Sequence, residues 1–264
     1  MRYLLAYMIV VIVIGISGCV SGTNDTGNLT IKTSENSTQL QVEGTETQIK
    51  SGNLTYPAYV AAPTTGNKKP GIILIHSFRG LEPGYLDLVD KMASENYVVI
   101  APRWQTFETS PSDPAVGQLI KDSIVYLKAR PDVDSNMLGL TGFCAGGRYT
   151  MLFLPQIEEL DSGVAWYGFP YSGGSATQPD KPVDVLEGLE YPMLIIHGTR
   201  DQASNISGIY AYAAELDAAD KYFEMKVYQG QPHGFMIEEG QLSQIFEAQD
   251  AYWQMMTFFD RTLK

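Results

Sequence analysis

Short apolar runs alternate with longer amphipathic stretches along most of this chain. Six runs are typical of strands buried on both faces of a sheet: GIILIH (71–76), YVVIAP (97–102), MLGLTGF (137–143), GVAWYG (163–168), MLIIHG (193–198) and FEMKVYQG (223–230). Apolar residues at three- and four-residue spacing predict helices between them, over about 84–95, 115–130, 146–158, 206–219 and 241–262. The alternation predicts an α/β fold with a mostly parallel central sheet, helices on both faces and ligand chemistry at the carboxyl ends of the strands.

Two further strand-like segments precede this alternation of strands and helices. LQVEGTETQIK and LTYPAYVAAP are typical of an antiparallel pair that turns near Ser51-Gly52-Asn53. Before them, residues 20–38 are rich in Ser, Thr and Asn, and Leu29 and Ile31 are their only large apolar side chains after Val20. Such a stretch buries too little surface to order itself, so we interpret it as a tether. The sequence therefore predicts one folded domain over residues 39–264, with no internal repeat.

The first residues have the pattern of an export signal. An uncharged run from Tyr3 to Ile16 follows Met1-Arg2 and ends at small residues before Cys19. The sequence Ile-Ser-Gly-Cys resembles the lipobox of exported lipoproteins, in which the cysteine becomes the first mature residue and carries lipid. An uncleaved N-terminal helix is the alternative interpretation. Both interpretations of residues 1–19 predict an extracytoplasmic domain anchored to the cell membrane.

Composition and charge narrow the choice of partners. Hydrophobic residues make up 44% of the 264 residues and charged residues 18%, which is typical of a globular protein. The net charge of −12 repels phosphate backbones, so nucleic acid is not an expected partner. The chain has two cysteines, and modification of Cys19 would leave Cys144 as a free thiol.

Cys144 lies in a distinctive motif directly after the predicted strand 137–143. The sequence Gly-Phe-Cys-Ala-Gly-Gly (142–147) has the pattern of a nucleophile elbow with sulfur in place of oxygen. A sharp turn from strand to helix needs glycines where side chains would collide, and the helix amino terminus beneath the cysteine favours a thiolate. A buried structural cysteine beside glycines is the alternative. The partners of Cys144 decide between the two.

A thiol nucleophile needs a base, and the base needs an orienting carboxylate. Of the three histidines, His76 and His197 end apolar strands and are expected to be core or loop residues, whereas His233 follows the last strand in G-Q-P-H-G-F. Asp201 follows another strand end, where a helix-capping role is the alternative. The chain order Cys144, Asp201, His233 is the order that a nucleophile, acid and base take in the α/β-hydrolase topology.

These motifs resemble the dienelactone hydrolase family over about residues 45–264. G-F-C-A-G-G resembles the family's cysteine elbow, H-G-T-R-D carries its acid at Asp201, and H-G-F carries its histidine at His233. The resemblance implies an α/β-hydrolase fold and hydrolysis of small-molecule esters or lactones through an acyl-cysteine intermediate. It implies an oxyanion hole from the backbone N–H groups of Phe78 and Ala145, and no metal or organic cofactor.

The sequence also departs from the family pattern. The family often carries His-Glu after the first parallel strand, with a carboxylate that helps to activate the cysteine, but this chain has His76-Ser77. His233 would therefore activate Cys144 directly. Candidates for substrate binding follow strand ends: Ser77, Arg79, Arg103 and Tyr167. Solvated arginines and ordinary aromatic packing are the alternatives for the last three.

The sequence also fits other functions. A surface-tethered binding module with lost turnover would fit the missing glutamate, and a thioesterase or acyltransferase would use the same nucleophile. An intact triad favours an enzyme, since loss of selection for turnover would be expected to damage it. A metal site is disfavoured because no close Cys/His pair has ligand spacing.

Overall fold

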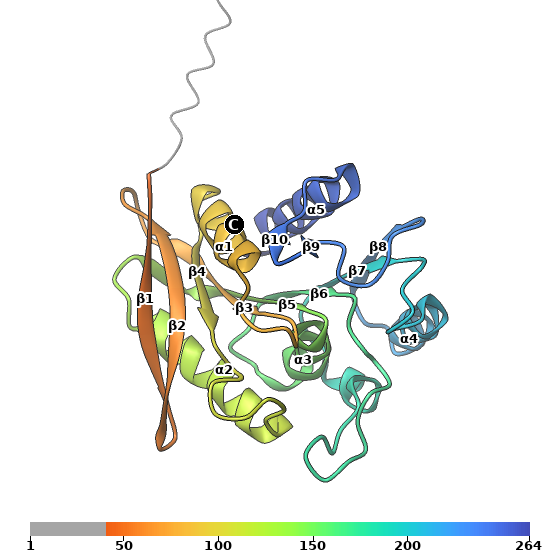
Figure 1. The fold of residues 1–264 in the computed structure, drawn as a ribbon. Helices are drawn as coiled ribbons and strands as arrows, with labels where there is room; N and C mark the ends of the chain where they lie inside the picture. The colour runs from red at the N-terminus through yellow and green to blue at the C-terminus, as the bar shows by residue number, and fades with distance from the viewer. Residues whose placement is uncertain (1–40) are drawn as a thin grey trace, which may run out of the picture. The chain divides into compact units, whose positions relative to one another are not determined.

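The computed structural model describes residues 41–264, which belong to a compact unit spanning Gln39–Lys264. The predicted export segment 1–19 and tether 20–38 lie outside the described residues. Within residues 41–264, an eight-stranded sheet has the order β1-β2-β4-β3-β5-β6-β7-β8 (Figure 1). Its strands are β1 (Val42–Ser51), β2 (Leu54–Pro63), β3 (Lys69–Ile75), β4 (Val98–Pro102), β5 (Val133–Phe143), β6 (Ser162–Trp166), β7 (Met193–Gly198) and β8 (Phe223–Tyr228).

Strand direction follows the expected pattern. β1 pairs antiparallel with β2, and β2 pairs antiparallel with β4, while the neighbours from β4 through β8 are parallel. β3 is buried along its whole length, as a strand covered on both faces must be. The predicted mostly parallel α/β fold is confirmed.

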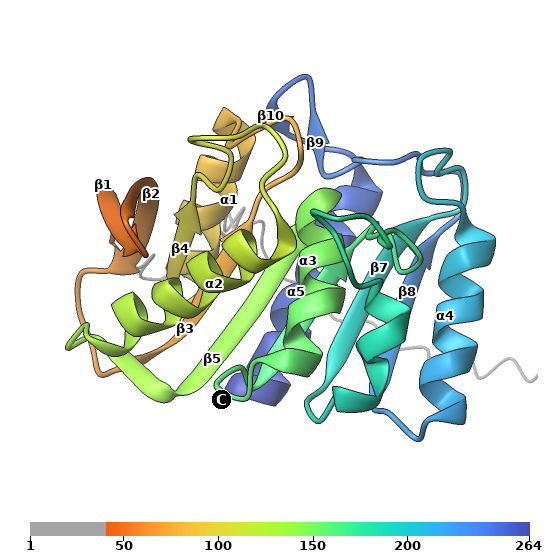
Figure 2. The same cartoon turned by 90° about the horizontal axis from the view of Figure 1, so that it is seen from below.

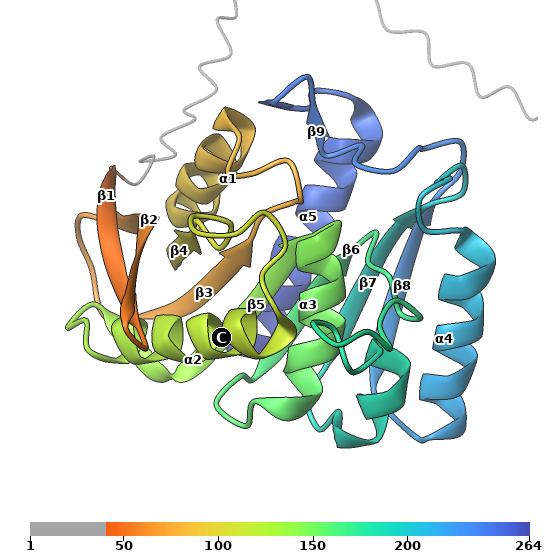
Figure 3. The same ribbon diagram turned by 60° about the horizontal axis from the view of Figure 1, so that its bottom comes forward.

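Helices cover both faces of the sheet. α1 (Pro83–Ser94) and α5 (Phe246–Leu263) pack on one face, and α2 (Asp113–Lys128), α3 (Ala145–Phe153) and α4 (Ile206–Ala218) on the other. Figure 2 looks onto the face covered by α2, α3 and α4, and Figure 3 shows these three side by side with α5 behind the sheet. Two separate apolar cores result, one on each side of the strands.

Two helix boundaries differ from the sequence prediction. The helix expected over 146–158 changes to a 3-10 turn at Leu154, because Pro155 has no N–H to continue the α-helical ladder. The helix expected from 241 begins at Phe246. A short hairpin of β9 (Ile237–Glu238) and β10 (Gln241–Leu242) precedes it, turning at Gly240 with a φ of 78°.

The loops that follow β3, β5, β7 and β8 leave the same edge of the sheet, because these strands are parallel. Cys144, Asp201 and His233 lie in or at the end of these loops. Within residues 41–264, no helix combines the length and apolar character needed to cross a bilayer.

Candidate active site

Cys144 occupies a sharp turn between β5 and α3. Its φ of 58° and ψ of −112° are unusual for a residue with a side chain, and it is the N-cap residue immediately before α3. The flanking glycines are needed because backbone passes close to them. A Cβ at Gly142 would lie 2.1 Å from the oxygen of Gly146, and a Cβ at Gly146 would lie 2.0 Å from the oxygen of Ile75.

The turn leaves backbone donors beside the sulfur. Cys144 itself donates its N–H to the oxygen of Trp166 at 3.1 Å. Among residues 41–264, the N–H groups of Ala145 and Phe78 have no acceptor. Ala145 is the first residue of α3, so its N–H is one of those that a helix leaves unpaired at its start. These free donors are compatible with the predicted oxyanion hole.

His233 and Asp201 form a short hydrogen bond. Nδ1 of His233 lies 2.7 Å from Oδ2 of Asp201, whose side chain is fully buried. The other carboxylate oxygen, Oδ1, accepts from the backbone N–H groups of Ala203 at 2.9 Å and Ser204 at 2.7 Å. Asp201 is therefore fixed in orientation, and it in turn orients the imidazole.

The surroundings of His233 increase the affinity of its imidazole for a proton. Burial lowers the pKa of His233, but hydrogen bonding to Asp201 and the proximity of the Cys144 thiol outweigh burial and raise the pKa to about 9. Its Nε2 is buried and has no hydrogen-bond partner that meets normal geometry among residues 41–264. This nitrogen is the one available for proton exchange with Cys144 or a substrate.

Cys144 and His233 line one small cavity of about 120 Å³. Three of the predicted substrate-binding residues, Ser77, Arg79 and Tyr167, lie in its wall. The full lining is Ser77, Arg79, Glu82, Tyr85, Cys144, Tyr167, His233, Gly234 and Ile237. The fold thus brings together residues that are up to 160 positions apart in sequence.

Arg103 lies outside this lining. Its guanidinium bonds to Oε1 of Glu46 on β1 at 2.8 Å, which turns it toward the antiparallel edge of the sheet. Tyr171, which flanks the same loop as Tyr167, is exposed and donates to Glu215 at 3.0 Å. Arg79 is the arginine that remains beside the cavity.

Glu82 and Tyr85 are in the cavity wall although no motif in the sequence pointed to them. Glu82 is the residue before α1, and Tyr85 lies one turn later on the same helix. The only sequence signal was their place at the start of the helix that follows β3. His197 was also not assigned to the site, yet its Nε2 lies 3.4 Å from Oδ2 of Asp201 and 2.8 Å from the oxygen of Ser204.

His76 lies beneath the site and has no hydrogen bond through Nε2 to any of residues 41–264. Burial lowers the pKa of His76 to about 4, and its ring stacks on Trp104 with centroids 5.4 Å apart. The side chain is therefore neutral and fixed. Among residues 41–264, no three His, Cys, Asp or Glu side chains gather as metal ligands would.

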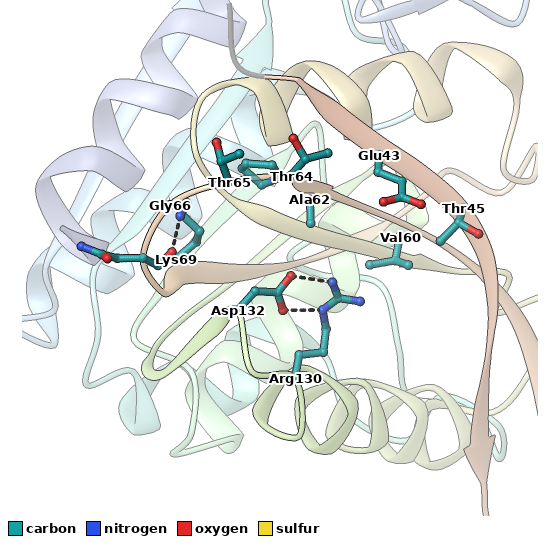
Figure 4. Close-up of a pocket in the computed structure, with 12 residues that line it drawn as sticks. Glu43, Thr45, Val60, Ala62, Thr64, Thr65, Gly66, Lys69, Arg130 and Asp132 are labelled. Atoms are coloured by element: carbon teal, nitrogen blue, oxygen red, sulfur yellow. Dashed lines mark hydrogen bonds and ion pairs between the residues drawn. The ribbon is translucent and has the colours of Figure 1, made fainter.

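A larger cavity of about 450 Å³ lies at the opposite edge of the sheet (Figure 4). Three of its charged side chains already have partners: Arg130 holds Asp132 through two hydrogen bonds of 2.9 and 2.6 Å, and Nζ of Lys69 donates to the oxygen of Asn67. Lys69 begins β3 and Asp132 precedes β5, so this cavity is at the amino ends of the strands. Cys144, Asp201 and His233 lie at the carboxyl ends of the strands, away from this cavity.

Comparisons with known proteins agree with this geometry. The sequence matches the Dienelactone hydrolase family over residues 56–118 and 104–263. A protein of Methylorubrum extorquens named "Putative carboxymethylenebutenolidase" is 27% identical over 231 residues, covering 81% of this chain and 79% of that protein. A protein of Escherichia coli K12 with the same name is 28% identical over 230 residues, covering 81% of this chain and 85% of its own.

A solved structure is also similar. The crystal structure of a "Putative Dienelactone Hydrolase" from Klebsiella pneumoniae has a TM-score of 0.78 and 26% sequence identity, and the match covers 84% of this chain and 99% of that chain. The family match spans most of the described residues, including the strand ends that carry Cys144, Asp201 and His233. The chain therefore belongs to the dienelactone hydrolase family and is a hydrolase that acts on ester or lactone bonds.

Proposed function

We propose that this protein hydrolyses esters or lactones through an acyl-cysteine intermediate on Cys144, with His233 as acid and base and Asp201 as its orienting partner. One observation carries the proposal. His233 is hydrogen-bonded to the buried Asp201 at 2.7 Å through one nitrogen, and it shares the wall of a cavity with Cys144. The names of the relatives, which refer to a butenolide lactone, support a lactone as one form of the substrate.

The acylation step uses the Cys144–His233 pair. The thiol proton passes to Nε2 of His233, and the sulfur attacks the carbonyl carbon, so that a C–S bond forms and the carbonyl becomes an oxyanion. The N–H groups of Ala145 and Phe78 would donate to that oxyanion. As the oxyanion collapses, the C–O bond to the alcohol breaks and His233 returns its proton to the departing oxygen. Asp201 stabilises the imidazolium that exists between the two transfers.

Deacylation reverses these roles with water. His233, now neutral, takes a proton from a water molecule that attacks the thioester carbonyl. The C–S bond breaks, the acid is released, and the sulfur recovers the proton from His233. In a lactone the alcohol and the acid belong to the same molecule, so one ring-opened product leaves after the second step. No metal or organic cofactor is required by these steps.

Ser77 occupies the position where the family often has a glutamate. Its hydroxyl accepts from the N–H of Arg79 at 3.2 Å, so it stabilises the loop after β3 and does not act as a carboxylate base. We infer that His233 alone takes the proton from Cys144. This is consistent with its position in the cavity wall and its raised pKa.

The pH profile of hydrolysis tests the role of His233. For the ester of an aliphatic alcohol, kcat/KM is expected to fall as pH rises through about 9, because imidazolium is lost above the raised pKa of His233. In Asp201→Asn the carboxylate that raises this pKa is gone, so the fall should move to lower pH, toward the ordinary value of 6.5. The measurement is kcat/KM against pH for both proteins.

The matched control is the p-nitrophenyl ester of the same acid. Its leaving group departs without needing a proton, so the fall at high pH should be smaller than for the aliphatic ester. A high-pH limb that stays at the same pH in wild type and Asp201→Asn would contradict the proposed role of the Asp201–His233 pair.

We also propose that residues 1–19 export the protein and anchor it outside the cytoplasm through lipid on Cys19. The support is the uncharged run from Tyr3 to Ile16 and the small residues before the cysteine. One acyl chain holds a protein only marginally, so stable anchoring implies more than one chain. Cys19→Ser is expected to move the protein out of the membrane fraction or leave an unprocessed precursor, measured by fractionation and intact mass. Wild-type protein found wholly in the cytosol at full-length mass would refute this proposal.

A further inference from the structure

The cavity beside Cys144 contains two charged side chains of opposite sign. Nε of Arg79 lies 3.4 Å from Oε1 of Glu82, and both residues are in the cavity wall. Their exposure differs greatly: the side chain of Arg79 is 70% exposed, whereas that of Glu82 is 15% exposed. The arginine extends into solvent, and the glutamate stays inside.

Because Arg79 is exposed and Glu82 is largely buried, the two charges do not act equally on an acyl group bound in the cavity. Water screens an exposed guanidinium strongly, while a carboxylate within the protein wall acts at a lower effective dielectric constant. Other charges do not reverse the effect. His233 is matched by Asp201 at 2.7 Å, and Arg103 is bound to Glu46 outside the cavity. Glu82 therefore makes the inner cavity unfavourable for a second negative charge.

The size of the cavity and the hydroxyl groups in its wall also restrict which acyl groups it can hold. The cavity is small, at about 120 Å³, so the part of the acyl group that it holds must be short. Ser77, Tyr85 and Tyr167 supply hydroxyls to the wall. The hydroxyl of Tyr167 is buried and has no hydrogen-bond partner that meets normal geometry among residues 41–264, so it is free to donate to a substrate oxygen.

We propose that Glu82 is a specificity-determining residue that directs the enzyme toward esters of short, uncharged acids and away from those with an anionic acyl group. The inference rests on the proposed function, because it assumes that the acyl group is held beside Cys144. Glu82 acts by neutralising Arg79 and by repelling a substrate carboxylate. Arg79 alone would favour that carboxylate, since a guanidinium suits carboxylate geometry.

The test compares two p-nitrophenyl esters with acyl chains of similar length. One is the neutral pentanoate and the other is the hemiglutarate, which ends in a carboxylate. The quantity measured on the full chain is the ratio of kcat/KM for the anionic ester to kcat/KM for the neutral ester. Wild type should favour the neutral ester, and Glu82→Gln should raise the ratio about tenfold. Arg79→Gln should lower it, because the guanidinium beside Glu82 is removed.

Asp87→Asn is the matched control. Asp87 is an exposed carboxylate on α1 outside the cavity wall, so its change removes the same charge from the molecule without altering the ratio. A ratio that is unchanged or lower in Glu82→Gln would overturn the inference, because Glu82 would then be neutral toward the substrate or would hold Arg79 in place for a carboxylate. A failure of the proposed function would be seen separately, as neutral-ester hydrolysis that persists in Cys144→Ala.

Discussion

Replacing Cys144 with alanine is expected to lower kcat/KM for ester hydrolysis by about a thousandfold or more, because the atom that carries the acyl group is lost. The sulfur lies at a turn that the fold builds at considerable steric cost, with glycines at 142, 146 and 147 allowing close backbone contacts. Alanine at 144 retains the Cβ and should not disturb this turn. The measurement is hydrolysis of a neutral p-nitrophenyl ester by wild type and variant at matched folding.

Companion variants separate the roles within the triad. His233→Ala should lose a comparable amount of activity since nucleophile and base act as a unit, while Asp201→Asn should lose less because orientation is partly replaceable. Cys144→Ser should turn over poorly, because a hydroxyl gives up its proton far less readily than a thiol. Cys19→Ser is the control for the other cysteine. Activity that survives in Cys144→Ala would show that the nucleophile lies elsewhere.

The second large effect is on stability. Arg148→Met is expected to destabilise the folded state by about 3–5 kcal/mol, because it leaves the carboxylate of Asp113 buried without a partner. In the native protein, the two side chains form paired hydrogen bonds of 2.7 and 2.8 Å and are 4% and 5% exposed. Arg148 also donates to the oxygens of Ser172 and Asp180, both at 2.9 Å. It thereby joins the start of α3, the start of α2 and the loop after β6.

The free energy of unfolding, measured by urea titration, checks this prediction. Arg130→Met is a matched control, because Arg130 holds Asp132 with the same paired geometry but the two side chains are 25% and 35% exposed. A partly solvated pair contributes about 0.2–1 kcal/mol, so the control should lose much less stability. Equal losses in the two variants would mean that burial does not determine the contribution of the Arg148 pair.

The sequence predicted the fold well where apolar runs are continuous. β3, β4 and β7 lie within one or two residues of their predicted ranges, because strands buried on both faces leave few polar positions to confuse the pattern. The β9–β10 hairpin was missed: β9 was not predicted, and the residues of β10 were assigned to the last helix. The turn depends on Gly240, and the N–H of Gly84 donates to the oxygen of Gly240 at 2.9 Å, a contact between distant segments.

The proposed catalytic residues could be predicted from the sequence, but the residues around them could be predicted only in part. Cys144, Asp201 and His233 each follow a strand end, so parallel topology alone places them near one another. Arg79 and Arg103 have the same kind of sequence position, but tertiary contacts separate them: Arg103 bonds to Glu46, 57 positions away. Glu82 lies in the cavity wall because of the conformation of the loop between β3 and α1. Such contacts have no signature in the local pattern of a single sequence.

The proposed mechanism requires that Cys144 carries the acyl group during turnover. Mixing the full chain with an activated ester, quenching with acid within the first turnover and sequencing peptides by mass spectrometry tests this directly. The peptide containing Cys144 is expected to gain the mass of the acyl group. In His233→Ala, this acyl peptide should form much more slowly. An acyl group found on Ser77 or another residue, or hydrolysis without any acylated peptide, would rule out an acyl-cysteine intermediate on Cys144.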